Sequence, residues 1–289
     1  MANKEAIIAL GDVIFDEIKK ILRRGDSLTW LMAINCVAFL IVCNISTIGT
    51  FASVDISWFY SWFFLSSSWW HVLTHPWQLL TYAFMHGDFI HFILNLLLLA
   101  MAGRLFETFF SERDLTGVYI MSALVGGICF VIGGVFVNAN GMLSGCSASV
   151  MALIVAPAVY APDYEIYLTL IGRVKLKWIA LVYVVITLLN MFSVNWAGQL
   201  AHVGGIATGA VFAWLLKNKR KNITAWLWKI VDATTKKDQP KFKVAYQNSD
   251  FRIKTEKELL DDILDKIKIS GYDSLSATER EFLRKMGDN

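Results

Sequence analysis

The stretch that decides the fold is residues 145–161, GCSASVMALIVAPAVYA, which contains no charged residue. Its helical part, residues 147–161, would be about 22 Å long as an α-helix. The hydrocarbon core of a bilayer is about 30 Å thick. We therefore expect a short membrane helix that has a serine, Ser147, at its first position.

The composition of the whole chain also indicates a membrane protein. Hydrophobic residues make up 56% of the chain and charged residues only 18%, whereas a soluble domain has about 25% charged residues. A membrane span needs about 20 apolar residues, and six segments approach that length: residues 30–48, 90–106, 117–137, 147–161, 178–192 and 200–216. The predicted fold class is therefore all-α, a polytopic membrane protein with a bundle of six transmembrane helices.

The basic residues predict the orientation of this bundle, because Lys and Arg gather in cytoplasmic loops. Residues 49–78, 138–145 and 193–199 contain neither Lys nor Arg. Every basic residue of the core falls on the other side of an alternating six-helix path. We expect both termini to be cytoplasmic, in a plasma membrane of the bacterial inner-membrane type.

The short fourth helix predicts the depth of Ser147. If Pro162 marks the inner boundary of the membrane, Ser147 lies several ångströms below the outer surface, and residues 138–144 dip inward. Non-helical backbone at that depth is stable only beside protein or a water-filled cavity. A submerged cavity open to the outer side is what hydrolysis inside a membrane requires.

The chain divides into three predicted regions. Residues 1–26 form an amphipathic segment on the cytoplasmic face, residues 27–218 form the membrane domain, and residues 219–289 form a cytoplasmic tail with short helices. Within the membrane domain, residues 54–77 are rich in Trp but too often polar to span, so we expect an outer loop in the membrane interface.

The tail contains two helix signals. Residues 256–269 have a helical pattern that Ser270 and Gly271 would end. The sequence Ser276-Ala277-Thr278-Glu279 has the form of a capping box, in which Ser and Glu satisfy each other's backbone N–H groups.

Ser147 and His202 are the residues that suggest chemistry. Each begins an apolar helix on the same predicted side of the membrane, and a serine beside a histidine base can carry out acyl transfer. Gly145 permits a tight turn before Ser147, whose own N–H is an unpaired helix-start donor suited to an oxyanion. The alternative is that Ser147 only bonds backbone or lets helices approach, and that His202 only bonds a neighbour.

Small residues predict that the fourth and sixth helices pack closely. Gly205 and Gly209 form a G-x-x-x-G pattern, and alanines recur at every fourth position of the fourth helix, at Ala148, Ala152 and Ala156. Such faces allow close backbone approach, with or without a catalytic consequence.

His86, His91 and Asn95 lie at the start of the second helix. His91 and Asn95 are four residues apart and share one helix face, where both can donate hydrogen bonds to a developing oxyanion. His71 and His75, with His86 and His91, also raise the possibility of a metal site. However, no acidic residue accompanies them as in the H-E-x-x-H motif, so we expect no metal and no cofactor.

These motifs resemble those of the rhomboid family of intramembrane serine proteases. The resemblance covers about residues 81–213 and rests on three signatures in order: Met85-His86 with His91 and Asn95, then Gly145-Cys146-Ser147-Ala148, then Ala201-His202-Val203-Gly204-Gly205. Residues 103–107, Gly-Arg-Leu-Phe-Glu, are also similar to the family.

The resemblance implies a function and its residues. Ser147 would be the nucleophile and His202 the general base of a Ser–His dyad that lacks the third carboxylate of the triad. His91, Asn95 and the Ser147 N–H would form the oxyanion hole, supported by Gly145, His86, Gly205 and Gly209. The substrates would be transmembrane helices of other proteins, cut near the outer face of the lipid bilayer. Nucleic acid is not an expected partner.

Three departures from the family pattern and two alternatives accompany this hypothesis. Ala148 stands where many members have Gly, Met151 stands where some bacterial members have an aromatic ring that supports the histidine, and the first outer loop lacks a Trp-Arg pair. The first alternative is an inactive rhomboid-like protein that binds membrane helices without cutting them. The second, a solute transporter, predicts inverted repeats or paired broken helices, which the sequence does not contain.

Overall fold

The computed structural model describes residues 25–137, 141–168, 172–190, 196–235, 256–276, 279–280 and 282–284. Its contacts divide the chain into two compact units, Met1–Thr235 and Lys236–Asn289. The amphipathic segment predicted for residues 1–26 lies almost entirely outside the described residues.

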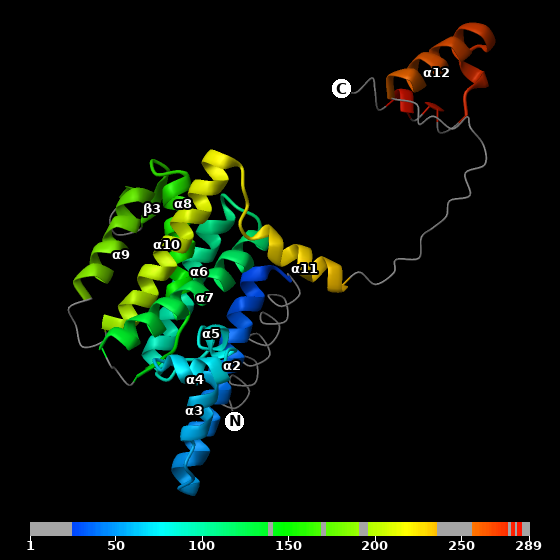
Figure 1. Ribbon diagram of the computed structural model, residues 1–289. Coiled ribbons are helices and arrows are strands. Elements are labelled where there is room, and N and C mark those ends of the chain that lie inside the picture. The colour runs from blue at the N-terminus through cyan, green and yellow to red at the C-terminus, as the bar shows by residue number, and fades with distance from the viewer. Residues whose placement is uncertain are drawn as a thin grey trace, which may run out of the picture. The chain divides into compact units, whose positions relative to one another are not determined.

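The first unit is mostly helical (Figure 1). Its elements, in chain order, are α2 Ser27–Ala52, α3 Ser57–Phe63, β1 Leu65–Ser66, α4 Trp69–Thr74, α5 Gln78–Thr81, α6 Phe89–Glu107, α7 Glu112–Val137, β2 Met142–Leu143, α8 Ser147–Tyr160, β3 Glu165–Leu168, β4 Gly172–Lys175, α9 Leu176–Asn190, α10 Trp196–Lys219 and α11 Ala225–Thr235.

Each of the six apolar segments of the sequence falls on one of these helices. Among the described residues, α2, α6, α7 and α10 are long and apolar enough to cross a membrane, whereas α8 and α9 are shorter apolar helices. The chain is therefore an integral membrane protein. The predicted outer loop, residues 54–77, contains no span and instead forms the short elements α3, β1 and α4.

Side-chain caps fix where two of the long helices begin. Asp26 accepts a hydrogen bond from the Thr29 N–H at the start of α2, with an N···O distance of 2.7 Å. Asp88 accepts one from the His91 N–H at the start of α6, at 2.8 Å. Such caps satisfy N–H groups that have no partner within the helix.

The close packing of α8 on α10 expected from their small residues is present. A Cβ atom at Gly205 would collide with the carbonyl oxygen of Ala148, and one at Gly209 would collide with that of Ala152. α7 completes this packing, because a Cβ at Gly126 would lie 2.9 Å from both the Ala148 Cβ and the Ala201 carbonyl oxygen. α7, α8 and α10 therefore approach one another so closely that Gly126, Gly205 and Gly209 have no room for a side chain.

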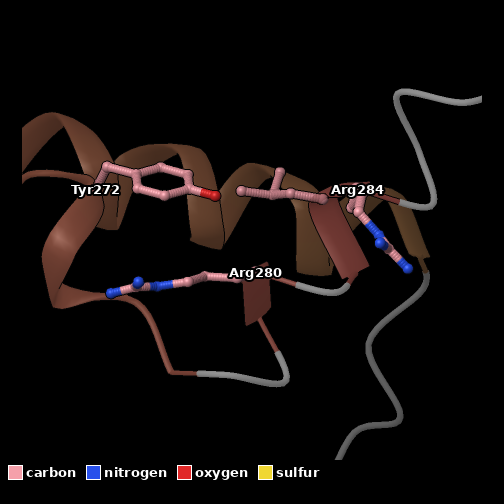
Figure 2. Close-up of a pocket in the computed structure, with 4 residues that line it drawn as sticks. Tyr272, Arg280 and Arg284 are labelled. Atoms are coloured by element: carbon pink, nitrogen blue, oxygen red, sulfur yellow. The ribbon is translucent and has the colours of Figure 1, made fainter.

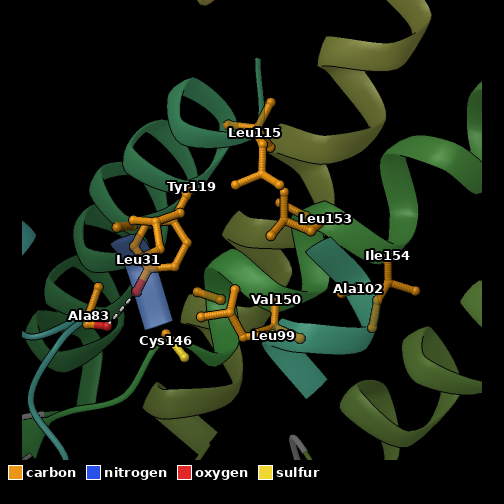
Figure 3. Close-up of a cluster of buried hydrophobic side chains, with 14 of the residues drawn as sticks. Leu31, Ala83, Leu99, Ala102, Leu115, Tyr119, Cys146, Val150, Leu153 and Ile154 are labelled. Carbon is orange, nitrogen blue, oxygen red and sulfur yellow. Dashed lines mark hydrogen bonds between the residues drawn. The ribbon is translucent and has the colours of Figure 1, made fainter. Parts of the chain in front are cut away.

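The core around this contact is apolar but contains a buried tyrosine that joins four segments (Figure 3). The Tyr119 hydroxyl donates to the Ala83 carbonyl oxygen at 2.9 Å and accepts from Asn35 Nδ2 of α2 at 3.2 Å. Ser149 Oγ of α8 donates to the Tyr119 carbonyl oxygen at 2.8 Å. These bonds satisfy polar groups where neither lipid nor water would.

Two short antiparallel ladders correct the expectation of a purely helical fold. β1 pairs with β2, Leu65 opposite Leu143 and Ser66 opposite Met142, while β3 pairs with β4. The β1–β2 ladder joins the loop before α4 to the segment that leads into α8. Strands of two to four residues have no detectable period in a sequence, so the pattern of apolar residues did not predict them.

The second unit contains α12, Glu256–Ser270, and the 3₁₀ turn η1, Tyr272–Ser274. The predicted stop is confirmed, because Gly271 follows α12 with a φ of +75°. The predicted capping box is also confirmed. The Ser276 N–H donates to Glu279 Oε2 at 2.7 Å, and the Glu279 N–H donates to Ser276 Oγ at 3.3 Å.

Candidate active site

The turn that precedes α8 depends on glycine. Gly145 has a φ of +107°, which L-residues with a Cβ rarely adopt. Its N–H donates to the Tyr82 carbonyl oxygen at 2.9 Å. A Cβ at this position would lie 2.8 Å from Cε1 of His91. Gly145 is therefore required both by its backbone conformation and by the closeness of the His91 ring.

Ser147 is the first residue of α8, as the sequence predicted. Because it is in the first turn, its N–H has no acceptor within the helix. The side chain of the preceding residue, Cys146, is buried and donates to Asn95 Oδ1 at an S···O distance of 3.6 Å. Cys146 is therefore directed toward α6.

His202 of α10 lies against Ser147. Its Nε2 is 2.7 Å from Ser147 Oγ, although 55 residues separate the two in the chain. Both side chains are half-buried. The 2.7 Å distance is that of a good hydrogen bond to a hydroxyl group.

The other ring nitrogen of His202 faces Gln199, a residue that the sequence pattern did not single out. His202 Nδ1 is 3.0 Å from Gln199 Oε1. An amide oxygen only accepts, so this contact favours the tautomer with the proton on Nδ1, in which Nε2 can accept from the Ser147 hydroxyl. Ser147, His202 and Gln199 thus form one hydrogen-bonded chain.

The missed residue has an identifiable signal. The apolar run that predicts the sixth span begins at residue 200, whereas α10 begins at Trp196. The prediction therefore left Gln199 in a loop, although Gln199 precedes His202 by three residues and shares its helix face. Met151, which stands where some family members have an aromatic ring that supports the histidine, is a buried residue of α8.

His91 and Asn95 lie together beside the Gly145 turn. Asn95 Nδ2 donates to the His91 carbonyl oxygen at 3.0 Å and lies 3.6 Å from the position that a Gly145 Cβ would take. One amide hydrogen of Asn95 serves that intrahelical bond, and an amide has a second one. Only 4% of Asn95 is exposed, so a partner of that second hydrogen would be shielded from water.

His86 is buried beside His91 rather than beside Ser147. The two rings are edge to face with centroids 5.5 Å apart, and His86 Nδ1 is 3.3 Å from the Phe84 carbonyl oxygen. Within the described part of the chain, Nε2 of His86 has no hydrogen-bond partner. His86 thus packs behind the ring of His91.

The histidines at positions 71, 75, 86 and 91 do not converge on a metal site. His71 and His75 stack on each other, with centroids 4.3 Å apart, and His71 Nε2 is 2.9 Å from the Ser61 carbonyl oxygen. Among the described residues, no group of three or more His, Cys, Asp or Glu side chains is arranged to hold a metal ion.

The loop that lacks the Trp-Arg pair is held by other bonds. Trp77 Nε1 donates to the Trp62 carbonyl oxygen at 2.8 Å. Gln78 is fully buried, donates to the Ser61 carbonyl oxygen and accepts from the Ser66 N–H. Trp77 and Gln78 therefore join the end of this loop to α3 and β1.

A recess in the second unit has a different character. It has a volume of about 580 Å³ and is lined by Tyr272, Arg280, Leu283 and Arg284. Figure 2 shows the side chains of Tyr272 and Arg280 lying side by side; the guanidinium carbon is 5.4 Å from the ring centroid. Among these four described lining residues, no nucleophile lies next to a base.

Comparison with protein-family models matches residues 73–219 to the family described as the Rhomboid domain. The matched region begins before α6 and ends at Lys219, the last residue of α10, so it includes Ser147, His202, His91, Asn95 and Gln199. A search of curated proteins finds no match to the chain.

Proposed function

The chain belongs to the rhomboid family, and we propose that it is an intramembrane serine endopeptidase that cuts transmembrane helices of other membrane proteins. The hydrogen-bonded chain from Ser147 through His202 to Gln199 carries this proposal. A serine that only packed two helices together would not need a histidine whose two ring nitrogens are each held by a hydrogen bond, one to the serine and one to Gln199.

The proposed reaction begins at Ser147 Oγ. The oxygen attacks the carbonyl carbon of the scissile peptide bond while its proton passes to His202 Nε2. Nδ1–H remains bonded to Gln199 Oε1, which holds the imidazolium in its orientation. The C–N bond then breaks, the leaving amine takes the proton from Nε2, and the acyl group stays on Ser147.

Water completes the cycle. His202 Nε2 takes a proton from the water as its oxygen attacks the acyl carbon, and the Ser147–acyl bond breaks as the proton returns to Oγ. No cofactor takes part in this sequence of steps.

The negative charge of each tetrahedral intermediate needs donors aimed at it. We assign this role to the Ser147 N–H, the ring of His91 and the second amide hydrogen of Asn95. The support is that His91 and Asn95 border Gly145, two residues before Ser147. His86 would limit the motion of His91, and Gly205 would hold α10 against α8.

The topology is also part of the proposal. We propose that α8 and α9 span the membrane as a fourth and a fifth helix, which gives six. The distribution of Lys and Arg supports cytoplasmic termini in a plasma membrane of bacterial inner-membrane type. Ser147, at the first position of a helix of 14 residues, would then lie below the outer surface.

Reconstitution with a model transmembrane substrate in proteoliposomes tests the proposal. Ser147→Ala and His202→Ala should each lower cleavage at least about 10³-fold, and the double variant should be no slower than either single one, because the two residues act as a unit. The contrary outcome is full cleavage by Ser147→Ala, which would exclude Ser147 as the nucleophile.

A serine-directed phosphonate distinguishes a protease from an inactive helix-binding member without a known substrate. We expect intact-protein mass spectrometry to detect the adduct in the wild type and in Cys146→Ala, but not in His202→Ala. Cys146 is the matched control, because it is the adjacent residue and its side chain bonds Asn95 instead of His202. Labelling that follows Cys146, or that persists without His202, would favour the inactive alternative.

A further inference from the structure

α11, Ala225–Thr235, is a helix that the apolar pattern did not predict and that the proposed reaction does not use. The segment before it is fastened to the first turns of α7. Asn222 Nδ2 and Thr224 Oγ1 both donate to Asp114 Oδ1, at 2.6 and 3.0 Å. Thr224 is fully buried against Gly117, where a Cβ would lie 2.5 Å from the Thr224 Cβ.

A second clamp holds α11 itself. Arg113 forms a two-pronged ion pair with Asp232, at 3.1 and 3.3 Å. Its guanidinium also lies 5.2 Å from the centroid of the Trp228 ring, and Trp228 Nε1 donates to the Arg113 carbonyl oxygen at 2.9 Å. One side of α11 is therefore bound to the start of α7.

Another side of α11 exposes apolar residues. Trp226, Ile230 and Ala233 are spaced by four and three residues, so they share one helix face. Trp226 is 49% exposed and Ile230 is 56% exposed. This face belongs to a helix that Figure 1 shows leaving the end of the bundle sideways.

The level of this helix along the bundle follows from its neighbours. α11 is bound to the first residues of α7 and follows α10 by a short link, and both α7 and α10 are long enough to cross a membrane. It therefore lies beside the charged ends of these two helices, where each would leave the hydrocarbon. Trp is favoured at that level because its ring is apolar and its N–H is polar.

The charges around α11 are mostly positive. Four basic residues lie between the last turn of α10 and α11, and a fifth lies beside the apolar face; all five are exposed: Lys217, Lys219, Arg220, Lys221 and Lys229. Three acids lie in this region: Glu112 accepts from the Ser27 N–H, Asp114 accepts from Asn222 and Thr224, and Asp232 is paired with Arg113. The surface thus matches anionic lipid headgroups and repels basic partners.

We propose that α11 lies in the membrane interface at this end of the bundle, with Trp226 and Ile230 among the lipid chains and the basic residues on anionic phospholipid headgroups. An apolar face flanked by Lys and Arg is the pattern of helices that bind this boundary. The clamp to α7 would then couple the lipid surface to the active site, because α7 packs at Gly126 against Ala148 and Ala201, the residues next to Ser147 and His202. The inference does not depend on the catalytic role of Ser147.

Spin labels test the depth of α11. Cysteine variants Trp226→Cys and Ile230→Cys, in a chain whose four native cysteines are replaced by alanine, would be labelled with a nitroxide and placed in nanodiscs. Leu40→Cys, on the exposed apolar side of α2, is the hydrocarbon reference, and Asp265→Cys, at an exposed position of α12 in the second unit, is the water reference. We expect labels at 226 and 230 to prefer collisions with oxygen, as at 40, over those with a nickel chelate, as at 265.

Lipid composition tests the headgroups. Discs of phosphatidylcholine with 30% phosphatidylglycerol should give deeper labels and a higher Tm than phosphatidylcholine alone, and high salt should reduce the difference because it screens exposed charges. Replacing Lys219, Arg220, Lys221 and Lys229 together by Gln should remove the difference. Phosphonate labelling of Ser147, or circular dichroism if that labelling is absent in the wild type, confirms that each variant is folded.

Each outcome decides the proposal. Oxygen-dominated labels that depend on anionic lipid support it. Nickel accessibility at 226 equal to that at 265 in both bilayers would overturn the insertion of α11, and insertion that is identical in both bilayers would overturn its binding of anionic headgroups.

Discussion

α8 and α2 are both apolar helices without a charged residue, yet they bury different shares of their residues. Eleven of the 14 residues of α8 are buried, against eight of the 26 residues of α2. α8 is rich in Ala and lies among α6, α7, α9 and α10, whereas α2 exposes large side chains such as Leu40 and Ile41. The apolarity of a helix therefore does not show whether it lies at the centre of the bundle or on its outside.

The two helices differ in how many residues they bury because their side chains differ in size. Polarity does not distinguish them, since lipid is as apolar as leucine. Burying a leucine side chain between membrane helices removes no contact with water, so tight packing has to come from close backbone approach. Gly205 and Gly209 of α10 supply this approach for α8. The same contact sets the distance between Ser147 and His202, because Ser147 is next to Ala148 and His202 is three residues before Gly205.

The largest expected effect comes from replacing Gly205 by a larger residue, because this disrupts the close packing of α8 on α10. Gly205→Val would drive a side chain into the Ala148 carbonyl oxygen, and overpacking costs about 1–3 kcal/mol or more even without a backbone collision. We expect cleavage below detection and a lower Tm in nanodiscs. The matched control is Ala207→Val, which adds a branched side chain to an exposed position of the same helix.

Ala207→Val should keep the activity and Tm of the wild type. If Gly205→Val kept them too, the contact between α8 and α10 would not be what sets the distance between Ser147 and His202.

A smaller effect on turnover is expected from replacing a buried asparagine of the bundle, Asn95, and none from replacing an exposed one, Asn44. Asn95 and Asn44 each donate to the carbonyl oxygen four residues earlier in their own helix, at 3.0 and 2.7 Å. Asn95 is buried beside Gly145, whereas Asn44 is exposed on α2. Asn95→Ala should lower turnover by roughly 10²–10³ if it is one oxyanion donor, and Asn44→Ala should leave turnover unchanged.

The measurement is kcat with a model substrate in proteoliposomes, and His91→Ala should change it in the same direction as Asn95→Ala. Equal rates for the Asn95→Ala and Asn44→Ala variants would mean that Asn95 serves only its own helix. The oxyanion would then need other donors.

The sequence predicted the parts of the fold that have a period or a long apolar run. All six apolar segments are helices, and the small residues of α8 and α10 do meet. It also predicted the pairing of Ser147 with His202, because the family motifs contain both. Residues that depend on a partner distant in the chain were not found. Gly126 is one, since nothing near it in the sequence indicates that Ala148 and Ala201 lie against it.

α11 and Gln199 were missed for a more local reason. The span of residues 200–216 was drawn where apolarity is continuous, so the polar first turn of α10 was counted as loop. α11 follows a run of basic residues and is short, so composition assigned it to the tail. Helix ends and interfacial helices are mixed in polarity, and a search for continuous apolar runs passes over both.

The smallest expected effect concerns Gln199, a half-buried polar residue in the first turn of α10. One neutral hydrogen bond is worth about 0.5–1.5 kcal/mol, so Gln199→Leu should lower kcat about 3- to 10-fold at unchanged KM. A purely structural role would instead lower Tm and the fraction of active protein, which titration with the phosphonate measures.

Gln199→Glu separates these roles further, because a carboxylate also accepts from Nδ1 and so restores the orientation of His202. It adds a negative charge that favours the imidazolium form, in which Nε2 cannot accept the Ser147 proton. The acid limb of the pH–rate profile should therefore move to higher pH, while kcat on the alkaline side recovers toward the wild type. A Glu variant that matched Leu in both rate and pH profile would show that Gln199 fills space without orienting His202. In that case the bond from Gln199 would resemble the one that Asn44 makes on α2, present in the fold but without effect on turnover.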